Sequence, residues 1–160
     1  TTKHSCELFN QMYHNLYNFD IINLRLFTVY GPRQRPDLAI HKFLKANLLD
    51  DEITLFGDGS MARDYTYVTD TVQGIFGAIK RINSENGIFE NFNLGNSSPV
   101  TLKDLIIAIE NVTGKKFNKK YIDVPPGDVP ITYADISKAK EFLNYNPRTS
   151  LSEGLENFNN

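Results

Sequence analysis

Cysteine and tryptophan are scarce in this chain of 160 residues, which has one cysteine and no tryptophan. Because Cys6 stands alone, no disulfide can form within the chain, and we expect a protein of a reducing compartment, the cytoplasm. No run of apolar residues approaches the roughly 20 that a membrane-spanning helix needs, so no membrane partner is expected. The fold must therefore depend on a packed core.

An excess of charge of either sign is also missing, with 17 Lys and Arg against 19 Asp and Glu and a formal net charge of −2. A nucleic-acid-binding protein would normally have a basic excess or stripe, so nucleic acid is not expected as a partner. The three histidines and Cys6 show no CxxC or HExxH spacing, and no metal site is predicted. The GxGxxG, GxSxG and Walker signatures do not occur in these residues either.

What the chain does contain is an alternation of strand-like and helix-like segments. Branched and apolar residues predict strands over 21–27, 53–56, 63–68, 88–95 and 119–124. Apolar residues at helical spacing predict helices near 1–17, 37–50, 69–82, 101–113, 135–143 and 150–158. Strands that alternate with helices indicate an α/β fold, and 41% hydrophobic residues are enough for a real core.

Capping residues mark several helix ends. Thr69 or Asp70 is expected to cap one helix. Its apolar face is predicted to comprise Val72, Ile75, Phe76, Ile79 and Ile82. Thr101 with Asp104 and Ser150 with Glu153 form capping-box patterns, and Gly114 stands where a C-terminal cap belongs.

The opening stretch has helical spacing without a convincing cap before it. It reads TTKHSCELFNQMYHNLYNF, with Cys6, Phe9, Met12 and Leu16 on one face. We therefore expect the chain to begin inside a helix, as a piece of a longer protein would. A processed start is the alternative.

Polar side chains gather in the loops at strand ends. They are Thr28, Arg33, Arg35, Arg63, Tyr65 and Asp128. Guanidinium groups bind phosphate or carboxylate oxygens, an aromatic ring packs on a base or sugar, and a carboxylate accepts from hydroxyls. A sugar-bearing nucleotide would use all three. Alternatively, Arg63 pairs with Asp64 or another surface acid and Asp128 caps a turn, and residue types alone favour this second interpretation.

Four stretches resemble the C-terminal half of the NAD-dependent epimerase/dehydratase family, the extended short-chain dehydrogenases that act on nucleotide sugars. The stretches are LRLFTVYGPRQRPDLAIHKF, LFGDGSMARDYTYVTDTVQGI, FNLGNSSPVTLKDLI and PGDVPITYADISKAKEFLNYNPRTSLSEGL. The stretch TVYGPRQRPDLA is most similar to the corresponding sequence of UDP-glucuronate 4-epimerases. The resemblance implies the last strands of a parallel Rossmann-type sheet plus a small mixed α/β substrate-binding lobe. Residues 1–30 would be the tail of the NAD-binding domain, with the catalytic helix and the following strand. Residues 31–160 would form mainly the substrate lobe, with some elements returning to the Rossmann domain.

The resemblance also implies roles for residues near the cofactor NAD. TTK is similar to the end of the family's Tyr-x-x-x-Lys signature, so Lys3 would be the catalytic lysine and bind the nicotinamide ribose. The tyrosine would lie two residues before Thr1, outside this sequence. A positive charge one helical turn away would favour its phenolate form. Phe27 would flank the nicotinamide.

On the substrate side, the resemblance implies contacts with the sugar and the diphosphate. Thr28 would touch the sugar, and Arg35, with Arg33 as a weaker match, would bind a diphosphate or a C6 carboxylate. Arg63 would bind the diphosphate, Tyr65 would lie near the nucleotide and Asp128 would bind the ribose hydroxyls. Where UDP-glucose epimerases have a second diphosphate arginine, this chain has Pro125, and this difference favours a glucuronate-type substrate.

The implied function is an NAD-dependent 4-epimerase that acts on UDP-glucuronate or UDP-glucose through a 4-keto intermediate. A 4,6-dehydratase or a decarboxylase of the same family is an alternative. A non-catalytic sugar-nucleotide-binding module is another, because the tyrosine and the Gly-rich loop are absent from these residues. The isolated chain is predicted to be inactive, and the whole protein is expected to be a homodimer that joins through the Lys3 helix.

Overall fold

A computed structural model describes residues 2–159 of the chain. The elements are, in chain order, α1 (Thr2–Tyr17), β1 (Ile21–Leu26), β2 (Thr28–Tyr30), α2 (Ala39–Leu49), β3 (Glu52–Phe56), β4 (Ala62–Tyr67), α3 (Val68–Ser84), β5 (Phe89–Leu94), β6 (Pro99–Thr101), α4 (Leu102–Thr113), β7 (Asn118–Ile122), α5 (Ser137–Leu143) and α6 (Leu151–Asn159). The alternation expected from the sequence is confirmed. The two strands that it did not predict, β2 and β6, have three residues each, too few for a periodic pattern.

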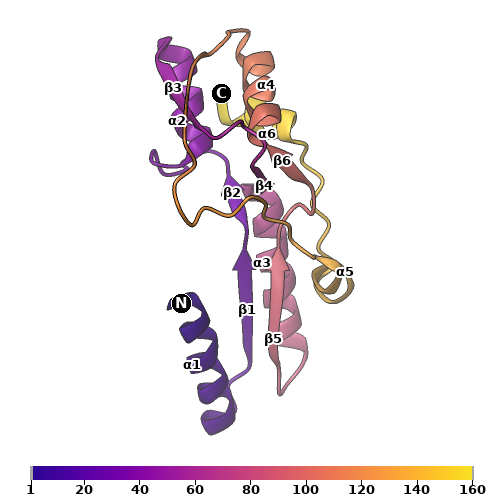
Figure 1. Cartoon of the computed structure of the whole chain (residues 1–160). Coiled ribbons are helices and arrows are strands. Elements are labelled where there is room, and N and C mark those ends of the chain that lie inside the picture. Colours follow the sequence, from indigo (N-terminus) through magenta and orange to yellow (C-terminus); the bar gives the residue numbers. More distant parts are fainter. Residues whose placement is uncertain (1, 160) are drawn as a thin grey trace.

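The strands form three small sheets, and most of their pairings are parallel (Figure 1). β1 pairs with β5, β2 with β4 and β3 with β7, all in parallel, whereas β4 and β6 are antiparallel. A parallel pair needs a long crossover between its strands, and here each crossover contains at least one helix. The α/β class with parallel strands is therefore confirmed.

Helix α1 lies antiparallel to β1 and contacts it through polar side chains. The Arg25 guanidinium donates two hydrogen bonds to the Glu7 carboxylate, at 2.7 and 2.6 Å. One turn along the helix, Asn10 Nδ2 donates to Asn23 Oδ1 at 2.5 Å. The large apolar side chains of α1 consequently point away from β1 and are exposed. They are Leu8, Phe9, Met12, Tyr13, Leu16 and Tyr17.

The core of the upper part in Figure 1 surrounds β2 and β4 and is covered by α2, α4 and α6. Its members are Tyr30, Ile40, Leu44, Tyr65, Tyr67, Leu105, Ile109 and Leu155. The Tyr30 ring packs edge-on against Tyr67, and Gly154 of α6 lies directly beneath its hydroxyl. A Cβ at position 154 would lie 2.1 Å from that oxygen, so only glycine permits this approach of helix to sheet. β4 is buried on both faces, not alternately as its sequence suggested.

Helix α3 differs from its sequence-based prediction in two respects. It begins directly after β4, and neither Thr69 nor Asp70 caps it. Instead, the Asp70 carboxylate accepts from the backbone N–H groups of Arg148 and Thr149. Its small residues face the sheet, and the three apolar residues Val72, Phe76 and Ile79 are exposed. The reason is close packing, because a Cβ on Gly74 would lie 2.7 Å from Leu94.

The other predicted helix boundaries are confirmed. Thr101 Oγ1 accepts from Asp104 N at 3.0 Å, and Gly114 ends α4 with a left-handed backbone, φ 72°. Ser150 Oγ accepts from Glu153 N at the start of α6. Within residues 2–159, none of the helices combines the length and apolar character needed to cross a membrane.

Candidate functional site

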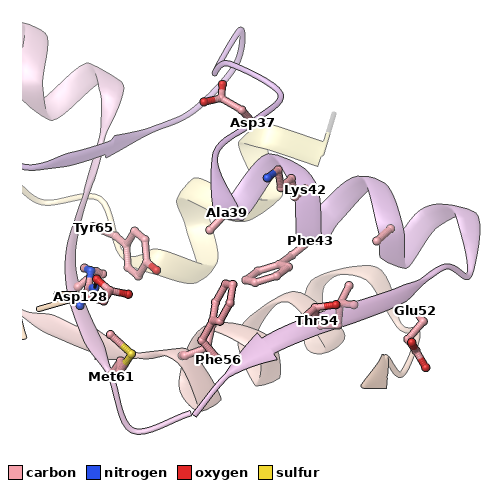
Figure 2. A pocket seen from close by; sticks show the side chains of 14 residues that line it. Asp37, Ala39, Lys42, Phe43, Glu52, Thr54, Phe56, Met61, Tyr65 and Asp128 are labelled. Carbon is pink, nitrogen blue, oxygen red and sulfur yellow. Dashed lines mark hydrogen bonds and ion pairs between the residues drawn. The ribbon is translucent and has the colours of Figure 1, made fainter. Parts of the chain in front are cut away.

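A cavity of about 520 Å³ lies between α2, β3 and β4 (Figure 2). Seven lining residues are apolar, namely Ala39, Phe43, Ala46, Ile53, Phe56, Met61 and Leu102. The other seven carry polar groups, and they are Asp37, Lys42, Glu52, Thr54, Arg63, Tyr65 and Asp128. A wall of this kind suits a ligand with a flat apolar portion and a charged portion.

Arg63 and Asp128 meet in this cavity although 65 positions separate them in the sequence. Arg63 Nη2 donates to Asp128 Oδ1 at 2.7 Å, and Arg63 Nη1 donates to the carbonyl of Ala62 at 2.9 Å. The loop that carries Asp128 is held against β4, because Ala62 N donates to Pro130 O. The acid that pairs with Arg63 is therefore a cavity residue and not Asp64.

Asp64 has a structural role instead, which the sequence did not predict. Its carboxylate is fully buried and accepts from three backbone N–H groups, those of Asn96 at 2.8 Å, Ser97 at 3.0 Å and Ala134 at 2.9 Å. These bonds join β4 to the turn after β5 and to the segment that follows Pro130. Asp64 thus fixes the strand on one side of the cavity and the chain that leads away from Asp128.

Tyr65 is 7% exposed, and its ring borders the cavity (Figure 2). The ring packs edge-on against Tyr30, with centroids 6.4 Å apart. Burial raises the pKa of the Tyr65 hydroxyl to about 12, so the group stays protonated near neutral pH. Tyr65 can offer a ring edge and a neutral hydroxyl to a ligand but is not suited to act as a base.

The two arginines between Pro32 and Pro36 lie outside the cavity wall. Arg33 is exposed, with a left-handed backbone, φ 66°. Arg35 is exposed too, and its Nη2 donates to Asp37 Oδ2 at 3.1 Å. Since Asp37 belongs to the cavity wall, this ion pair places Arg35 at the rim.

Phe27, Thr28 and Lys3 lie toward the carboxyl end of β1, and Thr28 is also the first residue of β2. Thr28 is half-buried and pairs in register with Tyr65. Phe27 follows β1 directly; its N–H donates to Leu94 O at 3.1 Å and its ring packs beside Gly95. Lys3 is exposed and lies one turn before Glu7, which pairs with Arg25 of β1. Because α1 runs antiparallel to β1 (Figure 1), the start of α1 lies toward the carboxyl end of that strand. Ligands of open parallel sheets bind at this edge.

Several cavity residues carried no recognisable signal in the sequence. The sequence predicts Phe43 within a helix and Phe56 within a strand, and it assigns no role to Met61 or Lys42, although all four line the cavity. A hydrophobic residue that lines a cavity and one that fills a core have the same pattern in a sequence. Only the distance between α2 and β3 distinguishes them.

A family model described as GDP-mannose 4,6 dehydratase matches residues 1–158. The chain belongs to this family. Among its family relatives, an uncharacterized protein of Methanocaldococcus jannaschii is 47% identical over 160 residues, covering 100% of this chain and 48% of the relative. A UDP-glucuronate 4-epimerase of Thermodesulfobacterium geofontis is 41% identical over 156 residues, covering 97% of this chain and 47% of the relative. The chain thus spans about half the length of the curated relatives it matches.

Solved structures of UDP-sugar epimerases share the fold. The UDP-glucuronic acid 4-epimerase of Bacillus cereus in complex with UDP-glucuronic acid and NAD is 42% identical, with a TM-score of 0.86 over 92% of this chain and 46% of that one. The UDP-glucose 4-epimerase of Thermotoga maritima with UDP-glucose is 34% identical, with a TM-score of 0.88 over 97% of this chain and 50% of that one. The resemblance to the epimerase/dehydratase family and the Rossmann-type fold expected from it are both confirmed.

Proposed function

We propose that this chain is the nucleotide-sugar-binding half of an NAD-dependent 4-epimerase that acts on UDP-glucuronate or UDP-glucose. The observation that carries the proposal is the cavity in which an apolar wall adjoins Arg63 and Asp128. A nucleoside diphosphate has a flat base, ribose hydroxyls and two phosphates, and these groups match an apolar wall, a carboxylate and a guanidinium in turn. The names of the epimerases reported above support the choice of a UDP-sugar.

The proposed roles follow the family resemblance. Arg63 would bind the diphosphate, Asp128 would accept from the ribose hydroxyls and Tyr65 would lie beside the nucleotide. Thr28 would touch the sugar, and Arg35, with Arg33 as a weaker match, would bind the diphosphate or a C6 carboxylate. Pro125, where a second diphosphate arginine would stand in UDP-glucose epimerases, favours UDP-glucuronate.

NAD is the proposed cofactor, and two described residues fit part of its site. Lys3 has an exposed ammonium and Phe27 a half-buried ring, both toward the carboxyl edge of the β1–β5 sheet. NAD, when bound, supplies hydride-transfer chemistry at C4 of the sugar. Lys3 would favour the phenolate of a tyrosine one helical turn earlier, which is the base that the chemistry requires. Residues 1–30 would then belong to the NAD-binding domain and residues 31–160 mainly to the substrate lobe.

A second candidate is a binding module that holds a sugar nucleotide without converting it. Its specific support is that Arg63 and Asp128 line a cavity that can hold a nucleotide without any contact to a redox cofactor. Dehydration or decarboxylation of the same substrate class is a third possibility within the family. For the complete enzyme we propose a homodimer that joins through α1, located in the cytoplasm.

Calorimetry with UDP tests the nucleotide site directly. We expect UDP to bind the chain and uridine to bind much more weakly, because Arg63 has no anion to contact in uridine. Co-incubation of the complete enzyme with NAD and several UDP-sugars, with products resolved by NMR, tests the reaction. If UDP does not bind, the nucleotide site is refuted; if UDP binds but no sugar is converted by the complete enzyme, the binding module is favoured.

A further inference from the structure

The ion pair in the cavity places a negative charge where the proposed diphosphate is expected. The Arg63 guanidinium already uses Nη1 for the Ala62 carbonyl and Nη2 for Asp128 Oδ1. A phosphate oxygen that approaches the same Nη2 would therefore come close to the Asp128 carboxylate. Two anions at such a distance repel each other, and the cost grows as water is excluded from the cavity.

The segment that carries Asp128 is built so that its middle can shift. Residues 123–130 are exposed throughout. The segment is tied at its two ends, where Gly57 N donates to Ile122 O at 2.8 Å and Ala62 N donates to Pro130 O at 2.9 Å. Gly127 has a left-handed backbone, φ 87°, and a Cβ there would meet no atom within 4 Å. Asp128 N also donates to Pro125 O at 3.4 Å within the segment, and the Asp128 side chain is 40% exposed, so its carboxylate can turn while both anchors stay in place.

Asp128 has few other contacts to give up. Apart from the ion pair, its carboxylate accepts only from Val129 N, the next residue in the chain, within the part of the protein described here. If the Asp128 carboxylate separates from Arg63, it loses the one hydrogen-bond partner in the described residues that is distant in the sequence. Hydroxyl groups close by would replace that partner, because an ionised carboxylate has several lone pairs to offer.

We propose that Arg63 and Asp128 form an exchange pair. When the ligand binds, its diphosphate replaces Asp128 as the partner of Arg63, and Asp128 accepts hydrogen bonds from hydroxyl groups of the same ligand. This inference rests on the proposed function. It makes the pair a determinant of specificity: a ligand must supply both an anion to displace Asp128 and hydroxyls to receive it. Inorganic pyrophosphate, which lacks hydroxyls, has to displace the carboxylate without compensation.

The test compares pyrophosphate with UDP on three forms of the chain by calorimetry at low ionic strength. The forms are the natural chain, Asp128→Asn, and Asp123→Asn as a control that changes the net charge equally on the same exposed segment but outside the cavity wall. We expect Asp128→Asn to raise the affinity for pyrophosphate by about fivefold, the effect of removing one like charge at close range in a solvated site. The preference for UDP over pyrophosphate should fall at least as much, and Asp123→Asn should change both affinities by less than about twofold.

The outcomes separate the exchange from the proposed function. Unchanged or weaker pyrophosphate binding by Asp128→Asn overturns the exchange, and so does a failure of pyrophosphate to bind either form, because the uncovered guanidinium should accept it. The second variant, Asp128→Ala, must show the same gain in affinity for pyrophosphate. If pyrophosphate behaves as expected but UDP does not bind, the competition at Arg63 stands and the nucleotide function fails. If UDP binds tightly without any gain for pyrophosphate, the function stands and the exchange fails.

Discussion

Arginines that look equivalent in the sequence have different surroundings in the structure. The Arg63 side chain is 23% exposed and lines the cavity, whereas the Arg35 side chain is 74% exposed and pairs with Asp37 at the rim. A partly buried guanidinium forms stronger bonds to an anion than an exposed one, because less water competes for its donors. Arg63 should therefore contribute more to nucleotide binding than either loop arginine.

Replacing Arg63 with alanine tests this difference. Arg63→Ala should weaken UDP binding by roughly 1–3 kcal/mol, the usual value of a charge-assisted hydrogen bond. Calorimetry measures the change, and Arg148→Ala, an exposed arginine outside the cavity wall, is the matched control. Equal UDP affinity in the natural chain and Arg63→Ala would refute the assignment of Arg63.

Asp64 is the buried residue for which we expect the largest effect on stability. Asp64→Asn keeps the shape but turns an amide N–H₂ toward backbone N–H groups that need an acceptor. The free energy of unfolding should fall by about 1–3 kcal/mol, the cost of leaving a buried donor unpaired. Urea unfolding measures the loss, and Asp123→Asn should leave the stability unchanged. A stable Asp64→Asn would mean that the three N–H groups find other partners.

At the scale of elements, Glu110 joins α4 to β7. Its carboxylate is almost fully buried and receives bonds from Lys116 and Lys119, each at 2.8 Å, and from the backbone N–H of Phe117 at 3.1 Å. Burial alone would raise the pKa of Glu110, but the two lysines and the N–H outweigh it and lower the pKa from 4.5 to about 2. The charged form is therefore the one that stabilises the fold.

The lowered pKa of Glu110 predicts the direction of a pH effect. A group whose pKa falls on folding stabilises the protein above its unfolded pKa and loses that contribution as the pH drops toward its folded pKa. Between about pH 5 and pH 2, the natural chain should lose more stability than Glu110→Gln, which cannot titrate. Thermal melting across this range gives the comparison. Parallel losses in both forms would show that Glu110 does not titrate as inferred.

At the scale of the whole molecule, the two helices beside the β1–β5 sheet leave large apolar side chains exposed. The exposed apolar residues of α1 and of α3 flank the β1–β5 sheet, and β1 has no strand on its other edge in the part of the chain that the structure describes. Exposed apolar faces of this kind are interaction surfaces or aggregation hazards. The isolated chain should therefore associate with itself through α1.

Two pairs of substitutions with similar exposure test which surface associates. Phe9→Ser with Leu16→Ser removes side chains of α1 that are 61% and 63% exposed, and Leu48→Ser with Leu49→Ser removes side chains of α2 that are 52% and 60% exposed. The α1 pair should weaken self-association at least about tenfold. This loss is a modest share of the free energy that burial of the two apolar side chains would supply. Sedimentation velocity measures both. An equal effect of the α2 pair would show that any exposed leucine suffices and that α1 is not the interface.

The elements of this protein and several of their caps followed from local patterns. Alternating strands and helices predicted the α/β fold, and Thr101 with Asp104, and Ser150 with Glu153, marked two helix starts correctly. These features depend on neighbours within four positions, so the sequence determines them by itself. The resemblance to the family likewise rested on short stretches read in order.

The surroundings of each side chain were decided only by tertiary contacts. Asp70 looked like a helix cap and instead binds the backbone at 148–149, and three of the five apolar residues predicted to face the core from α3 are exposed because Gly74 faces Leu94. The pairing of Arg63 with Asp128 joins positions 65 residues apart, while Asp64, next in the chain, points into the core. Periodicity shows which residues share a face of an element, but which face is covered depends on where other elements pack. That is why the local structure could be predicted from the sequence, whereas the cavity, its ion pair and the exposure of three apolar residues of α3 could not.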